Sequence, residues 1–454
     1  MAVYSIIQKS QLEGALRLDA EYYQPEYLEL ENKIKLKNWD YLGNLVIFNR
    51  RGIQPKYSEL VMPYKAIISQ NILEDFLDVD NLPSVEENFF NSIQSQLVKL
   101  KQYDILVYTT GANIGRTNIF YPNNVKAIAS NHVNIIRSNP DKINQLYLGL
   151  FLQSKIGRSW FNRWASGSDQ EEIYPDDLSK FPVFIPNVKT QSDLTENLIR
   201  SFKLLEESRK IYSKAENLLL EELGLKDFKP EEELSFVVNL SDIKSAHRAD
   251  AEYFQPKYEK IISKIKNQNA KLLGDLVSMK KGIEPGSEVY QEEGKLFIRV
   301  SNLSKHGLVE KDQKYLTEVL YQRLKKDFEP KTGEILLTKD ATPGIAYVVK
   351  EPIEGIISSG ILRLKLKEED IENEYLALCL NSVIGQMQAE RDGGGSIITH
   401  WKPEQIKNVL IPILPKSTQQ KIADLVKKSH EAYKQAKELL EEAKNKIENL
   451  IKNS

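Results

Sequence analysis

The stretch DAEYYQPEY, residues 19–27, returns near the middle of the chain as DAEYFQPKY, residues 250–258. Seven of the nine positions are identical, and one of the two differences is Tyr against Phe. Unrelated segments do not agree this far at one register, so the chain is predicted to be built twice, with an offset of 231 residues (250 − 19). A duplicated chain without a duplicated catalytic motif favours a binder with two sites over an enzyme.

The register continues on both sides of this box and defines two copies. The offset drifts by a few residues, as expected when surface loops change length and the framework does not. The first copy is predicted over about residues 1–231 and the second over about 232–454. The matched positions are 42–43 with 273–274, 52–55 with 282–285, 69–72 with 300–303, 104–106 with 334–336, Ala112 and Gly115 with Ala341 and Gly344, and 185–186 with 411–412.

Composition places the chain among ordinary globular proteins. Its 454 residues suffice for two cores of normal domain size, and 41% hydrophobic with 28% charged residues is a typical balance. No apolar run approaches the roughly 20 residues that cross a bilayer, and the first residues lack the pattern of a signal peptide. One cysteine, Cys379, excludes an intrachain disulfide framework. We therefore expect a cytoplasmic protein without a membrane segment.

The net charge of −2 limits what the isolated chain can do with DNA. Affinity that ignores sequence scales with the number of phosphates neutralised, so strong nonspecific binding by the chain alone is not expected. Local basic patches, or binding shared with a partner, remain open.

Each copy begins with short strands and turns, so the globular part is predicted to be mixed α/β. Apolar or alternating runs of strand length precede turns rich in Gly, Asn, Thr and Pro. Strands are expected at 103–108, 133–136, 334–337 and 361–364, and helices at 22–36, 146–157, 253–265 and 375–389.

Each copy ends in a long helical pattern, over 191–223 and 419–451, without an interior Gly or Pro. Heptads place large residues at one seam position and small ones at the other, which lets two backbones approach closely. The two helices are therefore predicted to pack on each other, and each would be roughly 50 Å long. The alternative is that each helix only caps its own domain. The predicted seam comprises Leu194, Leu198, Leu205, Tyr212, Ala215, Leu219, Ile422, Val426, Tyr433, Leu440, Ala443 and Ile447.

These patterns predict five segments. They are a first globular domain over 1–188, a first long helix over 189–225, a linker over 226–234, a second globular domain over 235–415, and a second long helix over 416–454.

Motifs for catalysis are missing, so the chain is predicted not to be an enzyme. A methyltransferase needs a Gly-rich cofactor loop and an Asn/Asp-Pro-Pro-aromatic motif, and neither is found. The run at 392–396 is glycine-rich but lacks the strand, Lys and Ser/Thr of a phosphate loop. The five histidines show no metal spacing, so no metal is expected, and the faint nuclease-like pattern at 175–180 is what a chain this rich in charge produces by coincidence.

Two mixed α/β units in tandem, each followed by a long helix, resemble the specificity subunit of type I restriction–modification systems. The resemblance covers the whole chain. Its local signs are 103–106 with 111–116, 333–336 with 341–344, and proline-ended strands at 184–186 and 410–412. The copies depart from each other where Lys339-Asp340 replaces Thr110-Gly111 and Ser359-Gly360 replaces Asn131-His132.

The resemblance implies that each α/β unit is a target recognition domain for one half of a bipartite double-stranded DNA site. It implies that the helices form an antiparallel coiled coil with approximate two-fold symmetry, which separates the domains and sets the unread spacer. Two modification subunits with S-adenosylmethionine and adenine N6-methyltransferase chemistry would dock on it, and restriction subunits would add ATP- and Mg-dependent cleavage. No cofactor is expected in this chain. A spacer of some 50 Å can span half-sites one helical turn apart, roughly 34–36 Å.

Direct readout of bases needs polar side chains on loops, with basic residues on phosphates. Basic pairs before Gly52 and Gly282 recur in both copies and are the better candidates. Asn and Ser beside Gly often only close turns, which is the structural alternative. The predicted DNA-binding residues are Arg50, Arg51, Ser69, Gln70, Asn71, Thr109, Thr110, Asn113, Arg116 and Ser168 in the first copy, and Lys280, Lys281, Arg299, Ser301, Asn302, Lys339, Thr342, Arg391, Ser396 and His400 in the second.

The acidic boxes at 19–27 and 250–258 do not suit DNA because carboxylates repel phosphate, so a framework role or a contact with modification subunits is expected. Two rival functions remain open. The first is a protein-interaction scaffold without DNA sequence preference, and the second is a stand-alone DNA-modifying enzyme.

Overall fold

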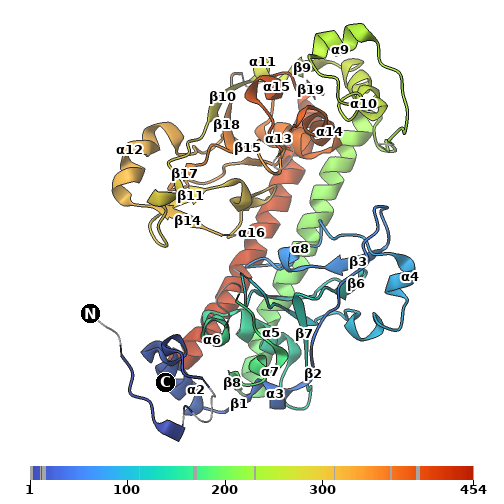
Figure 1. Ribbon diagram of the computed structural model, residues 1–454. Coiled ribbons are helices and arrows are strands. Elements are labelled where there is room, and N and C mark those ends of the chain that lie inside the picture. Colours follow the sequence, from blue (N-terminus) through green and yellow to red (C-terminus); the bar gives the residue numbers. More distant parts are fainter. Residues whose placement is uncertain are drawn as a thin grey trace. The chain divides into compact units, whose positions relative to one another are not determined.

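The computed structural model describes residues 4–452 except 11, 13–16, 112, 167–170, 230–231, 311, 369–370 and 395–398 (Figure 1). The chain forms two compact units. Unit 1 comprises Met1–Leu204 with Lys434–Ser454, and unit 2 comprises Leu205–Tyr433. Each unit therefore holds one globular body and part of both long helices. Among the described residues, no helix combines the length and the apolar character needed to cross a membrane.

The body of unit 1 is built on a four-stranded antiparallel sheet in the order β2-β7-β4-β5. Its central strand β4 (Ile105–Tyr108) buries three successive residues, which indicates that both faces of the sheet are covered. A parallel pair and a short antiparallel pair complete the body. The remaining strands are β1 (Trp39–Tyr41), β2 (Val46–Arg51), β3 (Tyr64–Ile67), β5 (Thr117–Ile119), β6 (Lys126–Ala129), β7 (Val133–Ser138) and β8 (Pro182–Phe184).

Unit 2 repeats this topology strand for strand. Its four-stranded sheet has the order β10-β18-β15-β16, β11 pairs in parallel with β17, and β9 pairs with β19. The strands are β9 (Ala270–Leu272), β10 (Val277–Lys281), β11 (Lys295–Ile298), β15 (Ile335–Thr338), β16 (Ala346–Val348), β17 (Gly355–Ile357), β18 (Ile361–Leu366) and β19 (Leu410–Pro412). The mixed α/β class and the duplication are thus confirmed.

Unit 2 also carries elements that the described part of unit 1 lacks. They are the hairpin of β12 (Leu303–Ser304) and β13 (Gly307–Leu308), the edge strand β14 (Lys314–Leu316), and the helix α12 (Glu318–Phe328). In unit 1 the corresponding stretch holds only the short helices α4 (Glu87–Phe90) and η3 (Gln96–Val98). The two bodies therefore share a framework and differ at its periphery.

The remaining short helices match in part between the two units. They are η1 (Ala20–Tyr23), α2 (Pro25–Lys35), α3 (Leu42–Leu45), η2 (Ser69–Asn71) and α7 (Pro175–Leu178) in unit 1, and α9 (Leu240–Ala246), α10 (Pro256–Lys266), α11 (Leu273–Leu276), η4 (Ser287–Val289), η5 (Val300–Asn302) and α15 (Pro403–Lys407) in unit 2.

The helices predicted at 146–157 and 375–389 are each two helices, so both predictions were wrong. The observed pairs are α5 (Gln145–Gln153) with α6 (Lys155–Trp164), and α13 (Asn373–Asn381) with α14 (Val383–Asp392). Ser154 leaves helical geometry with ψ at 164°, and its hydroxyl accepts a hydrogen bond from the Gly157 N–H at 3.3 Å. A Cβ on Gly157 would lie 2.4 Å from the Phe151 carbonyl oxygen, so the tight corner needs glycine. Serine as a helix N-cap explains the break.

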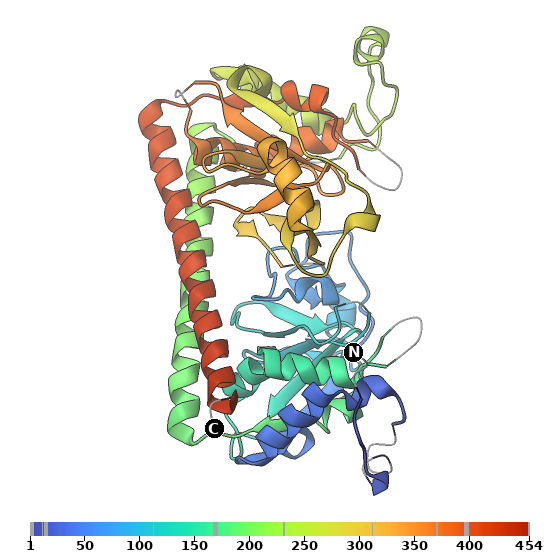
Figure 2. The same cartoon turned by 90° about the vertical axis from the view of Figure 1, so that its left-hand side faces the viewer.

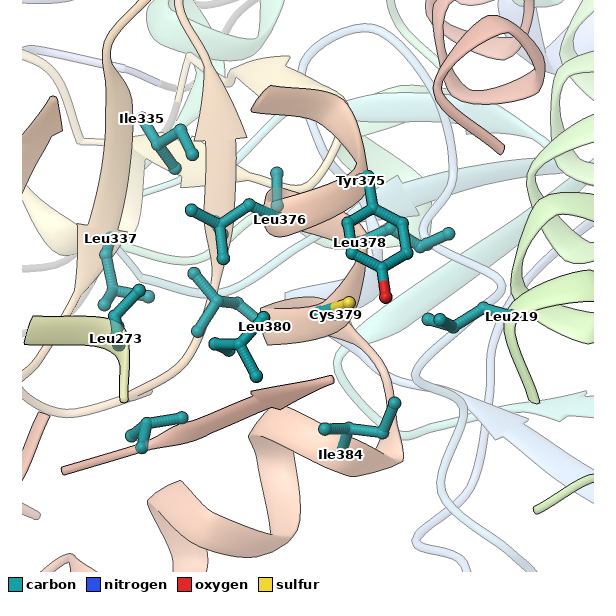
Figure 3. Close-up of a cluster of buried hydrophobic side chains, with 14 of the residues drawn as sticks. Leu219, Leu273, Ile335, Leu337, Tyr375, Leu376, Leu378, Cys379, Leu380 and Ile384 are labelled. Carbon is teal, nitrogen blue, oxygen red and sulfur yellow. The ribbon is translucent and has the colours of Figure 1, made fainter. Parts of the chain in front are cut away.

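Helix α13 forms the centre of the core of unit 2. Tyr375, Leu376, Leu378, Cys379 and Leu380 are all fully buried. Figure 3 shows them between side chains of the strand β15 and of the long helix that carries Leu219. Because the apolar residues occupy every face of α13, the helix is buried on all sides.

The repeated acidic segment, 19–27 and 250–258, forms an arginine–aspartate pair inside each body. The carboxylate of Asp19 accepts two hydrogen bonds from Arg17, each of 2.6 Å, and Arg17 also donates to the Trp164 carbonyl oxygen at 3.3 Å. The fork of Arg17 holds the pKa of Asp19 below its usual range. Arg248 repeats this fork on Asp250 at 2.8 and 2.5 Å. The predicted framework role of the box thus has a physical basis.

The long helices are α8 (Val188–Glu222) and α16 (Lys416–Lys452), and their bounds lie within three residues of those predicted. In unit 1 the Ser201 hydroxyl donates to the Ala436 carbonyl oxygen at 2.7 Å. In unit 2 the Ser429 hydroxyl donates to the Ser208 carbonyl oxygen at 2.8 Å. Since numbers rise on one helix as they fall on the other, the pairing is antiparallel. Figures 1 and 2 show the helices side by side within each unit.

These two hydrogen bonds are equivalent under the internal repeat. An offset of 228 residues converts Ser201 into Ser429 and Ser208 into Ala436. The seam therefore closes in the same way in both units, as a duplicated antiparallel pair requires. Because one helix bonds to the backbone of the other, the alternative that each helix only caps its own domain is excluded.

The predicted seam residues lie in the interior with one exception. Eleven of the twelve are buried, and Tyr433 is half-buried. Tyr433 stacks on His306 of the β12–β13 hairpin, with ring centroids 5.1 Å apart. The exception therefore contacts the added hairpin of unit 2.

Replacing Ser201 by Leu should disrupt the close seam, because the larger side chain has no space against the opposite backbone. We expect the free energy of unfolding to fall by about 1–3 kcal/mol. Urea unfolding of the purified chain measures this. Ser213→Leu, on an exposed part of α8, should change it by less than about 0.5 kcal/mol. Equal effects of the two variants would contradict the seam.

Two buried histidines pack beside the seam in unit 2. The rings of His306 and His430 have centroids 5.8 Å apart, and Tyr212 of α8 lies against both. Burial, aided by the nearby cations Lys305 and Arg209, lowers the pKa of His306 to about 3. Burial, aided by Lys350 and by His306, lowers the pKa of His430 to about 3. Both imidazoles are therefore neutral in the folded chain at neutral pH.

In the unfolded chain these histidines have their ordinary pKa of about 6.5. Below that pH the unfolded chain binds protons that the folded chain does not, so acid favours unfolding. We expect the free energy of unfolding to fall from pH 7.5 to pH 5, by at most about 2 kcal/mol for each histidine. His306→Phe keeps the ring and removes the titrating group, so it should lose less stability over this interval. Urea midpoints at both pH values measure the loss, and an equal loss in the variant would contradict the account.

Candidate nucleic-acid interface

The turn after the central strand of each sheet is bonded to a distant segment in the same way in both units. In unit 1 the Gly111 N–H donates to the Glu171 carbonyl oxygen at 2.8 Å, and the Ile173 N–H donates to that of Thr109 at 3.1 Å. In unit 2 the Ala341 N–H donates to that of Thr399 at 2.9 Å, and the Trp401 N–H donates to that of Lys339 at 2.8 Å. We call this pair of segments the junction: 109–111 with 171–173, and 339–341 with 399–401.

The junction corrects the alignment made from sequence. Ala112 was matched with Ala341 and Thr110-Gly111 with Lys339-Asp340, but the hydrogen bonds match Gly111 with Ala341 and Thr109-Thr110 with Lys339-Asp340. Gly111 and Ala341 both have positive φ, at 94° and 59°. The left-handed position moved by one residue because the turn of unit 2 is shorter, and the shared alanine concealed the shift. Ala112 lies outside the described residues.

The junction of unit 1 holds a cluster around a carboxylate. Glu172 accepts a hydrogen bond from Arg51 at 2.5 Å on one oxygen and from the Tyr174 hydroxyl at 2.5 Å on the other. The guanidinium of Arg51 lies 4.5 Å from the centre of the Tyr174 ring. The hydrogen bonds from Tyr174 and Arg51 lower the pKa of Glu172, so it is ionised at neutral pH.

The junction of unit 2 holds a different cluster. Asp340 contacts Lys339 at 2.6 Å on one oxygen and His400 Nδ1 at 2.8 Å on the other. Although burial works in the opposite direction, the hydrogen bonds from Lys339 and His400 lower the pKa of Asp340. Lys339 is buried, whereas the side chain of His400 is 58% exposed.

The basic pairs stand at the ends of β2 and β10, and in each sheet one strand separates them from the strand that leads into the junction. A Cβ on Gly52 would lie 2.1 Å from the Ala129 carbonyl oxygen, and one on Gly282 would lie 2.2 Å from that of Ser358. These close approaches explain why a glycine follows each pair.

A family model described as the type I restriction modification DNA specificity domain matches residues 43–214 and 265–449. The chain belongs to this family. One matched region lies in each copy of the repeat, and the predicted resemblance is confirmed.

Solved structures with similar folds include a type I restriction–modification S subunit from M. genitalium, 15% identical over 92% of this chain and 96% of that chain, with a TM-score of 0.39. They also include the HsdS subunit from Thermoanaerobacter tengcongensis, 14% identical over 91% of this chain and 95% of that chain, with a TM-score of 0.29. Because both scores are low, the family assignment depends on the family model and the repeat.

The candidate DNA contacts of this specificity subunit differ in exposure. The exposed ones are Arg50, Gln70, Lys280, Lys281, Thr342 and His400; the half-buried ones are Arg51, Ser69, Asn113, Arg299, Ser301 and Arg391; and the buried ones are Asn71, Thr109, Thr110, Arg116, Asn302 and Lys339. Ser168 and Ser396 lie outside the described residues. The junction brings together Arg51 with Thr109 and Thr110 in unit 1, and Lys339 with His400 in unit 2.

Some candidates have partners within the fold. Lys280 pairs with Asp327 at 2.6 Å, and Arg116 lies 3.3 Å from Glu74. Asn71 accepts from the Ile68 N–H at 3.0 Å, and Asn302 accepts from the Arg299 N–H at 3.0 Å. These asparagines close turns, which is the structural alternative given in the sequence analysis for Asn and Ser beside Gly. Contact of any candidate with DNA stays a prediction.

The carboxylates Glu172 and Asp340 and the ring of Tyr174 were not anticipated. Glu172 lies far along the chain from Arg51, and Asp340 lies far from His400. The spacing of residues in the sequence therefore does not indicate these contacts. Carboxylates were also not expected at a DNA contact, because they repel phosphate. Among the described residues, no three metal-ligating side chains gather into a site.

Asn302→Ala should leave the Arg299 N–H without its side-chain acceptor and lower the free energy of unfolding by about 1–3 kcal/mol. Thermal or urea unfolding of the purified chain tests this. Gln70→Ala, at an exposed position, serves as the control and should have little effect. Unchanged stability of Asn302→Ala, together with weakened DNA binding, would instead favour a direct contact.

Proposed function

We propose that each globular body recognises one half of a bipartite double-stranded DNA target, and that the chain itself performs no catalysis. The observation that carries this proposal is the junction. It has the same main-chain bonds in both units and unlike side chains on them. One framework with two different polar surfaces suits two readers of different sequences.

The basic pairs support a contact with DNA near the junction. Arg50 with Arg51 and Lys280 with Lys281 occupy equivalent strand ends. Contacts to phosphate fix the register of a protein on DNA, and contacts to base edges provide specificity. With a net charge of −2, the chain is expected to need partner subunits for tight binding.

The paired helices α8 and α16 suit two further roles. We propose that they set the unread gap between the half-sites and that two modification subunits dock on them. Those subunits would supply S-adenosylmethionine and the methyl transfer, and restriction subunits would supply the ATP- and Mg-dependent steps. An antiparallel pair with equivalent hydrogen bonds offers two equivalent surfaces for two copies of one partner.

The direct test is methylation of a random DNA library by the complex of this chain with its modification subunits. We expect methylation only at sites with two specific half-sites and a gap of fixed length. Methylation without sequence preference would favour a pure protein-interaction scaffold. Methyl transfer or cleavage by the purified chain alone would favour an independent enzyme.

Inserting one heptad into each long helix should widen the unread gap. The insertions belong between Leu204 and Leu205 and between Tyr433 and Lys434, where the two compact units divide and both seams keep their register. Seven residues add about 10 Å of helix, or about three base pairs of gap, without altering the half-sites.

The control places the same heptad in the connection after Asp227, outside the helices. The unread gap between the half-sites of this control variant should equal that of the unmodified chain. A gap that stays constant in the double-helix insertion, or widens equally in the control, would contradict the spacer role.

A further inference from the structure

The junction places one oriented polar side chain in each body. In both units a carboxylate holds that side chain, and the carboxylate is itself held by a second group. Glu172 is bound by Tyr174 in unit 1, and Asp340 is bound by Lys339 in unit 2. Both bodies therefore contain a polar side chain held by a carboxylate, with different residues in each.

In unit 1 the held side chain is Arg51. One terminal nitrogen donates to Glu172 at 2.5 Å, and the other donates to the Ile173 carbonyl oxygen at 2.6 Å. A guanidinium carries two N–H groups on each terminal nitrogen, so these contacts leave one on each. Stacking on Tyr174 fixes the plane of the group. The O6 and N7 atoms of guanine accept hydrogen bonds from such N–H donors.

In unit 2 the held side chain is His400. Its Nδ1 contacts Asp340 at 2.8 Å, so Nδ1 carries the proton in the neutral ring and Nε2 keeps a lone pair. The ring is more than half exposed. The lone pair of Nε2 accepts a hydrogen bond from an amino group such as adenine N6 or cytosine N4.

Both carboxylates are neutralised where they stand, which removes the objection that they would repel DNA. Glu172 is paired with Arg51, and Asp340 is paired with Lys339. Each cluster therefore presents a donor or acceptor without adding net negative charge.

We propose that Arg51 and His400 read bases at the junctions of the two bodies, with Glu172 and Asp340 as positioning residues. This inference rests on the proposed function and adds to it the residues that make the two half-sites differ. Lys281 takes the place of Arg51 in unit 2 and lacks the planar fork, so the two junctions cannot prefer the same base by the same contact.

The test measures methylation rates by the complex of this chain with its modification subunits, on a DNA set in which every base of both half-sites is varied singly. Arg51→Lys keeps the charge and copies the residue of unit 2. It should reduce the preference at one position of one half-site by about tenfold or more, and leave the other half-site unchanged.

Glu172→Gln should relax the preference at the same position as Arg51→Lys, by a smaller factor. Added to Arg51→Lys it should have no further effect, because its action passes through Arg51. A merely structural glutamate would instead lower the rate on all sequences alike, and that result would overturn the positioning role.

His400→Asn and Asp340→Asn form the matched pair in unit 2. Both should change one position in the other half-site, and neither should affect the position that depends on Arg51. The exposure of His400 makes His400→Asn the safer variant for folding, and the yield of assembled complex checks each protein.

The outcomes separate this inference from the proposed function. Two intact half-site preferences in all four variants, or a change in the wrong half-site, would overturn the inference and leave the bipartite reader standing. A complex of the unmodified chain that methylates every sequence alike would overturn the proposed function itself.

Discussion

The close approach of two long helices is the constraint on which the rest of the structure depends. At Ser201 with Ala436, and at Ser429 with Ser208, a hydroxyl of one helix reaches the backbone of the other at 2.7–2.8 Å. Only small side chains permit that distance, and the larger residues of the heptad fill the space beside them. Because the two helices are distant in sequence, this contact closes the chain on itself.

The same contact makes unit 1 depend on both ends of the chain. Unit 1 contains the last residues, and they are bonded to its body: Lys37 donates to the Leu450 carbonyl oxygen at 3.0 Å, and Glu448 accepts from the Lys155 N–H at 3.1 Å. Lys437 pairs with Asp75 at 2.8 Å. The final segment of α16 is therefore part of the first body, although sequence order assigns it to the second copy.

Duplication explains which features are shared and which differ. The strand order, the serine breaks at Ser154 and Ser382, and the arginine forks on Asp19 and Asp250 recur because they hold the framework. The junction side chains, the β12–β13 hairpin and α12 differ. Divergence at the periphery of a common frame is the pattern that a family of DNA specificity domains needs, since function resides in the site and not in the fold.

The sequence predicted the features that rest on local pattern. The repeat, the mixed α/β class and the two long helices follow from identity at one register and from heptads. The serine breaks were missed because one serine hardly disturbs an apolar run of 3.6 periodicity. The one-residue shift in the alignment of Gly111 with Ala341 was missed because Ala341 adopts a left-handed backbone conformation that usually requires glycine. The residue type alone does not reveal that conformation.

The candidate site was harder to predict than the fold. The basic pairs were found because they recur before a glycine. The roles of Glu172 and Asp340 were missed because their partners Arg51 and His400 are brought to them only by the folded chain. Buried Asn71 and Asn302 resembled contacts because a turn-closing amide and a base-reading amide are the same residue type.

The measurement that tests the account most directly is the methylation target of a chimera in which residues 232–454 are replaced by a second copy of residues 1–231. With its modification subunits, this chimera should methylate a symmetric site in which both halves match one half of the original target. An unchanged, asymmetric target would contradict the claim that each copy reads its own half of the DNA.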